Sequence, residues 1–331
     1  MEVVLERCAG LDVHQASVVC CVLIGVPGRK AQKLLRSFGT TTRELEALRA
    51  WLGEHGVTHV GMESTGVYWK PVYAVLEGHF DLIVGNAHHI KNVPGRKTDV
   101  KDAEWIAQLV RHGLVAQSFV PPPAIRDLRE LVRHRRTLVE TRTAGRNRVL
   151  KLLEGANIKL PGVASDVSGV SGMAMLAALA SGTNNASEMA GLARGRMRRK
   201  HAALEAALEG RMREHQCFLL GMQLRSLGTI DRDLDALDAR IGAQLEPYQA
   251  QHRLLMQIPG VDGVTAASII AEVGTDMDVF TAARRLAAWA ELAKVPRAKR
   301  VEYQRRAGSR RATTKARASR RVPAPAGATC S

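Results

Sequence analysis

The order of hydrophobic periods over residues 8–114 constrains the fold of this chain more than any other feature. Two β-rich runs within residues 8–24 are separated by His14 and Gln15, a pattern typical of a hairpin, and residues 33–40 predict a third strand. A helix, a strand, a helix, a strand and a last helix follow in alternation. Three antiparallel strands followed by strands with helical crossovers predict a mixed α/β domain.

The first predicted helix, residues 41–56, carries signals for its start, its buried face and its end. Thr41 and Glu44 stand at capping-box spacing, and Gly56 marks the end. Three leucines would form one apolar face: Leu45, Leu48 and Leu52. The elements that follow are a strand over 57–65, a helix over 69–78, a strand over 80–87 and a helix that begins near Asp99.

A long uninterrupted helix is predicted over residues 125–153, which contain no proline and one glycine. A series of its positions, spaced alternately three and four residues apart from 125 to 153, would form the contact seam of a coiled coil. Three of these positions are Arg135, Arg142 and Arg146, so the segment is either an imperfect coiled coil or a helix with one basic stripe. The span 126–151 holds nine Lys or Arg and three acids, which favours nucleic-acid contact or an ordinary solvated face.

The remainder of the helical part contains a second long helix and a short hairpin. Residues 158–195 are rich in Ala, Gly and Ser and show no clear period, whereas residues 197–245 predict the returning arm of a long hairpin. Within residues 254–274, Gly260 and Gly263 allow a tight turn between short helices that would expose backbone N–H groups to phosphate. The pattern is typical of a helix-hairpin-helix element, or of an ordinary helical hairpin in a core.

The charge of the chain favours a polyanionic partner. The 331 residues carry a formal charge of +16 with a pI of about 10.2, which is typical of proteins that bind nucleic acid or an anionic membrane. Membrane attachment is disfavoured because no apolar run reaches ~18 residues and the N-terminus is not a signal peptide. The five cysteines show no CxxC spacing, so neither disulfides nor a zinc site are expected. Free cysteines are typical of proteins in a reducing cytoplasm, which is the predicted location.

Four acidic residues stand at predicted strand or helix ends: Asp12, Glu63, Asp99 and Asp102. Each has an ordinary explanation as a turn cap, a surface acid, a helix N-cap or a partner of the helix dipole. Arg96, Lys97 and Lys101 surround the last pair and are candidate phosphate contacts. The acids are therefore candidates for a shared site only if the fold brings them together.

Four stretches of the sequence carry a family resemblance. They are GLDVHQ, ESTGVYWKPVYAVLE, VGNAHHIKNVPGRKTDVKDAEWIAQLVRHGL and IPGVDGVTAASIIAEVG with the later ARRLAAWAEL. Together they resemble the DEDD transposases of insertion sequences, in the one-ten group of recombinases guided by a bridge RNA. The resemblance implies a ribonuclease H-like (RuvC-like) domain over 1–122, a helical coiled-coil arm over 123–250 and a helix-hairpin-helix domain over 251–293. A basic tail, disordered or frameshifted, would occupy 294–331.

The resemblance also implies how the site is built. In such a sheet the first and fourth strands are adjacent and the last helix packs across their ends, which would bring the four acids together. Crowded carboxylates call for a cation, and two Mg²⁺ ions suit oxygen ligands and phosphoryl transfer. The implied activity is that of a bacterial, nucleoid-associated DNA transposase or site-specific recombinase acting on element ends and target DNA with a guide RNA. A homo-oligomer, dimer or tetramer, is expected because recombination must hold two duplexes.

Residues 294–331 depart from the family pattern. They carry 12 Lys or Arg against one acid, Glu302, and the resemblance ends near Lys294. The family's nucleophilic serine stands in Pro-Gly-Asn and Ser-Ala-Gly-Lys runs that are absent here, and Ser309 matches neither. The tail is either an out-of-frame translation or a basic extension that binds nucleic acid. Two alternatives to strand transfer follow: a magnesium-dependent junction nuclease that uses water, and an impaired nucleic-acid-binding relic.

Overall fold

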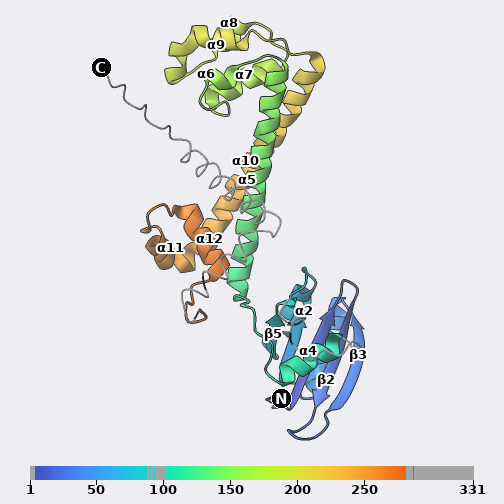
Figure 1. The fold of residues 1–331 in the computed structure, drawn as a ribbon. Coiled ribbons are helices and arrows are strands. Elements are labelled where there is room, and N and C mark those ends of the chain that lie inside the picture. Colours follow the sequence, from blue (N-terminus) through green and yellow to red (C-terminus); the bar gives the residue numbers. More distant parts are fainter. Residues whose placement is uncertain (1–3, 88–89, 91–92, 94–101, 281–285, 287–331) are drawn as a thin grey trace, which may run out of the picture. The chain divides into compact units, whose positions relative to one another are not determined.

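The computed structural model describes residues 4–87, 90, 93, 102–280 and 286. The chain divides into two compact units, Met1–Val120 and Pro121–Ser331. We call them the sheet unit and the helical unit and describe each by itself (Figure 1).

The sheet unit is built on one mixed five-stranded sheet in the order β3-β2-β1-β4-β5. The strands are β1 (Arg7–Val13), β2 (Ser17–Ile24), β3 (Gln32–Gly39), β4 (His59–Glu63) and β5 (Asp81–Gly85). β2 pairs antiparallel with both β1 and β3, and β4 pairs parallel with both β1 and β5. The predicted hairpin, the third strand and the contact between the first and fourth strands are confirmed. The arrangement fits an α/β domain of the ribonuclease H-like kind.

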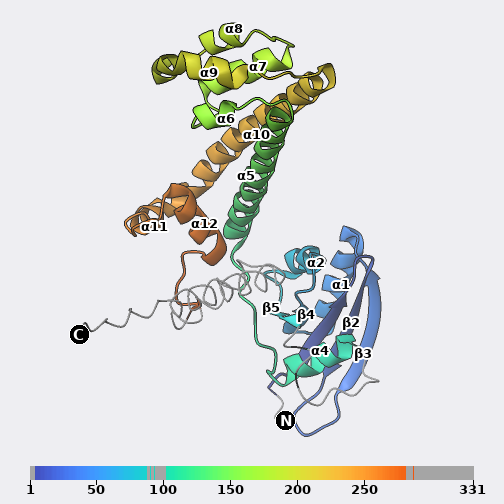
Figure 2. The same cartoon turned by 45° about the horizontal axis from the view of Figure 1, so that its top comes forward.

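Helices cover both faces of this sheet. They are α1 (Thr42–Glu54), α2 (Trp69–Leu76) and α4 (Asp102–Arg111). Alternate residues of β1 separate two cores: Ala9 and Leu11 belong to the core with α1 and α2, whereas Cys8 belongs to the core with α4. Figure 2 shows α4 and the α1–α2 pair on opposite sides of the strands.

The start of α1 corrects one prediction. Leu45, Leu48 and Leu52 are buried as expected. Thr41 occupies the N-cap position, but its side chain makes no capping hydrogen bond. Glu44 accepts instead from the backbone N–H of Gly39 at 3.3 Å, because the chain bends directly from β3 into the helix. The predicted capping box is therefore wrong.

The helical unit is organised around two long antiparallel helices, α5 (Pro123–Gly155) and α10 (Glu214–Leu245). Between them in sequence lies a group of short helices, which packs with α5 and α10 into one apolar core. Its members are α6 (Leu160–Val163), α7 (Val170–Ala180), α8 (Ala186–Gly191), η1 (Gly195–Lys200) and α9 (His201–Leu208). The returning arm, predicted over 197–245, begins only at Glu214, because residues 195–208 form η1 and α9. The segment 158–195, which had no clear period, is largely helical (Figure 1).

A second core lies at the opposite ends of α5 and α10. It joins them to the segment η2 (Glu246–Tyr248), α11 (Gln249–Leu255) and α12 (Gly263–Val273). Ile125, Leu128 and Val132 of α5 meet Ile270 and Ala271 of α12 there. No helix in the described part of the chain is both long and apolar enough to cross a membrane.

Candidate acidic site and basic surfaces

Asp12 and Glu63 lie at the ends of adjacent parallel strands. Residues Gly10 and Gly61 are paired in the β1–β4 register, so Asp12 and Glu63 each stand two residues further along. A Cβ placed on Gly10 would meet Ala103 and Ala107, and one on Gly61 would meet Ile106 and Val110, so both glycines face α4. Because side chains alternate along a strand, Asp12 and Glu63 share that face.

Asp102 is brought to the same edge by the direction of α4. The Cys8 thiol donates to the carbonyl of Ala107 at 3.5 Å, while Gly10, two residues later in β1, lies against both Ala103 and Ala107. Thus α4 runs antiparallel to β1, and its first residue, Asp102, lies toward the end of β1 that carries Asp12.

The close approach of α4 to the sheet depends on two glycines. A Cβ on Gly10 would stand 2.2 Å from the backbone nitrogen of Ala107, and one on Gly61 would stand 2.3 Å from a methyl group of Val110. Backbone therefore packs on backbone where α4 crosses β1. Sequence reasoning did not identify this role of the GLD and GME glycines.

The two strand-end acids have local partners that the sequence analysis did not identify. Nε2 of His14 lies 3.1 Å from Oδ2 of Asp12, and the hydroxyl of Thr65 donates to Oε1 of Glu63. Each partner lies two residues after its acid, so the spacing in GLDVH and MEST could have suggested both contacts. The Asp12 side chain is 26% exposed, which leaves its carboxylate reachable from solvent.

Glu104, two residues into α4, is used differently. It pairs with Lys33 of β3 at 2.9 Å, and this hydrogen bond raises the pKa of Lys33 above its ordinary value. Glu104 therefore ties α4 to the sheet and is not a further member of the acidic edge.

The acidic edge, which we define as Asp12, Glu63 and Asp102, supplies the hard oxygen ligands that Mg²⁺ prefers. Among the described residues, no three His, Cys, Asp or Glu side chains form a group that could hold a metal ion. Mg²⁺ in proteins takes one or two carboxylates together with phosphate oxygens and water. The chemistry and number of the two strand-end acids fit this ligand set. Asp99, Arg96, Lys97 and Lys101 lie outside the described residues.

Two of the three predicted basic-stripe residues bridge α5 to α10. Arg142 lies 3.1 Å from Asp231, and Arg135 pairs with Asp238, a hydrogen bond that raises the pKa of Arg135. Arg146 is exposed. Arg135 and Arg142 therefore stabilise the pairing of α5 with α10. The contact of the three arginines with nucleic acid stays a prediction.

The turn between α11 and α12 contains both predicted glycines. Gly260 has a φ of +84°, a conformation that favours glycine, and Gly263 is the first residue of α12. The carboxylate of Asp262 accepts from the N–H of Thr265 at 2.7 Å, and the contacts with Thr265 lower the pKa of Asp262. An acid thus already caps the helix start where phosphate binding was predicted, and that binding stays a prediction.

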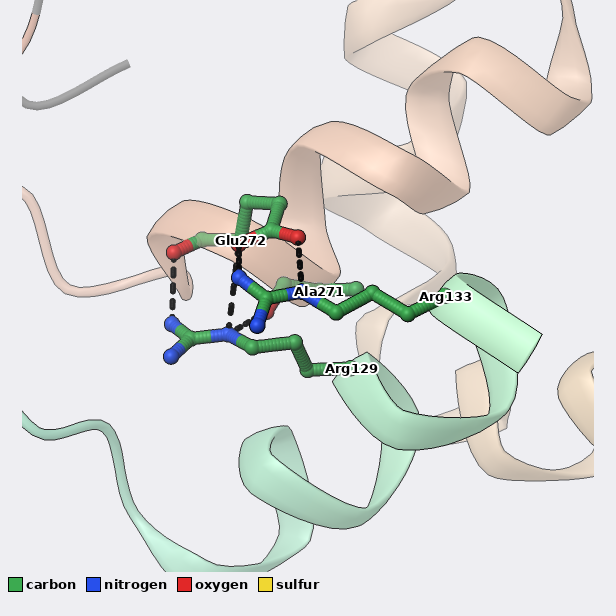
Figure 3. A network of polar contacts seen from close by, with 4 residues as sticks. All are labelled: Arg129, Arg133, Ala271 and Glu272. Carbon is green, nitrogen blue, oxygen red and sulfur yellow. Dashed lines mark hydrogen bonds and ion pairs between the residues drawn. The ribbon is translucent and has the colours of Figure 1, made fainter. Parts of the chain in front are cut away.

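A cluster of ion pairs holds α12 on α5 (Figure 3). Arg133 binds both carboxylate oxygens of Glu272 at 2.7 Å, which raises the pKa of Arg133. Arg129 donates to the carbonyls of Ala271 and Glu272 at 3.0 and 2.7 Å, and burial lowers the pKa of Arg129. These bonds satisfy carbonyls at the end of α12 that the helix itself leaves unpaired.

Two family models match the chain. The DEDD model of the IS110 group, described as Transposase, matches residues 9–158, and the model described as Transposase IS116/IS110/IS902 family matches residues 252–318. Together the matches span about two thirds of the chain. The second match continues past Lys294, where we expected the resemblance to end. No curated protein matches the sequence.

Proposed function

Because the chain belongs to the IS110 family of DEDD transposases, we propose that it cleaves and exchanges DNA strands at the acidic edge. One observation carries the assignment: β1, β4 and the start of α4 bring Asp12, Glu63 and Asp102 to one end of one sheet face. Asp99, three residues before Asp102 in sequence, is proposed as the fourth acid of the site.

Divalent cations, with Mg²⁺ as the proposed physiological ion, would be held by Asp12 and Glu63 together with phosphate oxygens. When bound, such a cation would supply neutralisation of the phosphate charge and stabilisation of the departing oxygen. The chain's own residues set the geometry of the carboxylates. His14 and Thr65 each contact one oxygen of an acid, which limits the rotation of that carboxylate.

The DNA backbone would be held by basic side chains of the chain. Arg96, Lys97 and Lys101 precede α4 in the sequence and are proposed as phosphate contacts, because cations beside a phosphate-cleaving site attract the backbone without reading its sequence. The turn at Gly260 and Gly263 is a second proposed backbone contact, and a helix-hairpin-helix role for α11 and α12 belongs to the same proposal. A guide RNA and a homo-oligomer complete it.

The sequence after Lys294 favours a second candidate reaction. Since the Pro-Gly-Asn and Ser-Ala-Gly-Lys runs are absent, this chain could use water as the nucleophile and act as a junction nuclease. A serine nucleophile leaves a covalent protein–DNA adduct, whereas water leaves free ends.

One assay separates these outcomes. The protein, a guide RNA and target DNA are incubated with Mg²⁺, and adducts and free ends are resolved on a denaturing gel. Asp12→Asn should abolish both products and retain DNA binding. Asp81→Asn is the matched control, because Asp81 is an exposed acid at the start of β5, where it lies beside His59. Cleavage by the Asp12 variant at the wild-type rate would exclude the acidic edge as the site.

A further inference from the structure

A short basic segment in the helical unit has no role in the site described above. Residues 194–200, RGRMRRK, hold five cations and no acid within seven positions. Arg194 is the N-cap residue of the 3₁₀ helix η1 (Gly195–Lys200), which leads directly into α9. All five cationic residues are exposed.

The backbone of this segment is fixed to the apolar core of the helical unit. Ala193 before it and Leu204 after it are buried, and Met197 in its middle packs against the same core. The backbone N–H of Arg194 donates to the buried Ser171 hydroxyl at 2.9 Å. An anchored array of charges loses less conformational entropy on binding than a flexible tail would.

The five cations differ in what they contact. Arg198 donates to the carbonyl of Ala193 at 3.3 Å, and Lys200 donates to the carbonyl of Val163 at 2.9 Å. These two side chains stabilise the turn itself. Arg194, Arg196 and Arg199 have no side-chain hydrogen bond or ion pair with any described residue, unlike the paired arginines of α5.

The local geometry places two of the unpaired arginines together. In a 3₁₀ turn, residues three apart lie on one edge, separated by about 6 Å along the axis. Arg196 and Arg199 have this spacing within η1. Phosphates recur every ~3.4 Å of axis along one strand of a duplex, so a spacing of about 6 Å corresponds to roughly two phosphate steps, and both arginines can contact phosphates of one strand.

We propose that Arg194, Arg196 and Arg199 form a further nucleic-acid site, which binds the phosphodiester backbone of a duplex without reading its sequence. The inference rests on the proposed nucleic-acid substrate of this chain but does not require the acidic edge or a metal ion. It assigns the short helices between α5 and α10 a function as a platform that presents these arginines.

The test compares three full-length variants that carry triple substitutions. The first changes Arg194, Arg196 and Arg199 to Ala. The second changes the same residues to Lys and keeps their charge. The third is a charge-matched control in the sheet unit, where three exposed cations are changed to Ala: Arg29, Lys30 and Arg43. Thermal unfolding verifies that each variant is folded.

Binding is measured by fluorescence anisotropy without divalent cation, over a series of salt concentrations. The probes are a DNA duplex and an RNA duplex of the same sequence, each of about 30 base pairs, or three helical turns. The Ala triple should reduce the slope of log K against log salt by about two to three on at least one probe, because each lost phosphate contact removes about 0.9. The Lys triple should retain most of the slope, and the control triple should change it little.

The probe that responds identifies the nucleic acid. An equal loss in the Ala triple and in the control would show that net charge alone matters and would overturn the proposal. An unchanged slope in the Ala triple on both probes would overturn it as well. Neither result would affect the cleavage assay, so failure of this site is distinguishable from failure of the acidic edge.

Discussion

Two helices of this protein are attached by contrasting means. In the sheet unit, α4 approaches the strands through Gly10 and Gly61, where backbone lies on backbone. In the helical unit, α12 is attached to α5 by Arg129, Arg133 and Glu272 in addition to an apolar core. Close backbone packing responds weakly to salt and pH, whereas ion pairs respond to both.

The contrast extends to Asp12 and the paired acids of the helical unit. Asp231, Asp238 and Glu272 of the helical unit each bind an arginine of α5, so their charge serves the fold. Asp12 of the sheet unit contacts a histidine that is itself 61% exposed. Counting acids or arginines along the sequence therefore does not identify sites, because a residue already used in an internal ion pair is less available to a ligand.

Gly10→Ala should have the largest effect on stability. The added methyl group would stand 2.2 Å from the backbone nitrogen of Ala107, so α4 would have to move. We expect a loss of about 3 kcal/mol in the free energy of unfolding of the sheet unit, at the upper end for overpacking. Urea unfolding measures it. Gly53→Ala is the control, because nothing lies within 4 Å of its Cβ position, and it should be neutral or stabilising. Equal effects would contradict the close packing.

Glu272→Ala should destabilise the helical unit by a smaller amount, about 1–2 kcal/mol. The substitution removes the bidentate partner of Arg133, while Arg129 keeps its two carbonyl acceptors. Its effect should shrink at high salt. Glu140→Ala removes only an exposed pair with Arg136 and should change the free energy of unfolding by less than about 0.5 kcal/mol. An effect of Glu272→Ala no larger than that of Glu140→Ala would show that the apolar core alone holds α12.

Asp238→Ala should cost less again, about 0.5–1 kcal/mol, since Asp238 is half exposed and its pair with Arg135 is screened by solvent. The same substitution releases Arg135, so it provides a second test. If Arg135 can bind phosphate when unpaired, Asp238→Ala should strengthen binding of a DNA duplex at low salt. Unchanged binding would leave Arg135 with its structural role alone.

Asp262→Asn should give the smallest effect and a dependence on pH. The folded-state pKa of Asp262 is lowered by its hydrogen bonds with Thr265. A lowered pKa stabilises the folded state above the unfolded-state pKa, and this contribution is lost as the pH falls through the folded-state pKa. The urea midpoints of wild type and variant should therefore differ near neutral pH and converge below the ordinary range of Asp. A difference that persists in acid would assign it to the cap geometry instead.

The helices and strands of the sheet unit were predictable because their hydrophobic residues recur with a clear period. Alternating and 3.6-residue patterns located β1 to β5 and the buried leucines of α1. The cap of α1 was predicted wrongly, because the partner of Glu44 is decided by how β3 joins the helix. The short helices between α5 and α10 were missed, because segments rich in Ala, Gly and Ser carry little amphipathic signal and gain their order from the shared core.

The candidate site was predictable in its strand positions and less so in its contacts. The placement of Asp12 and Glu63 at neighbouring strand ends follows from the strand order, which the family resemblance implied. The contacts with His14 and Thr65, and the pairing of Arg135 and Arg142 with acids of α10, depend on residues that meet only in the folded chain. No period in a single sequence carries that information.

Calorimetric titration with Mn²⁺ tests the central claim most directly, because it detects the metal site without requiring activity. The acidic edge predicts that the wild-type protein binds Mn²⁺ and that Asp12→Asn and Glu63→Gln each weaken this binding by at least about tenfold. Asp81→Asn should leave it unchanged. Wild-type affinity for Mn²⁺ in the Asp12 and Glu63 variants would contradict the account.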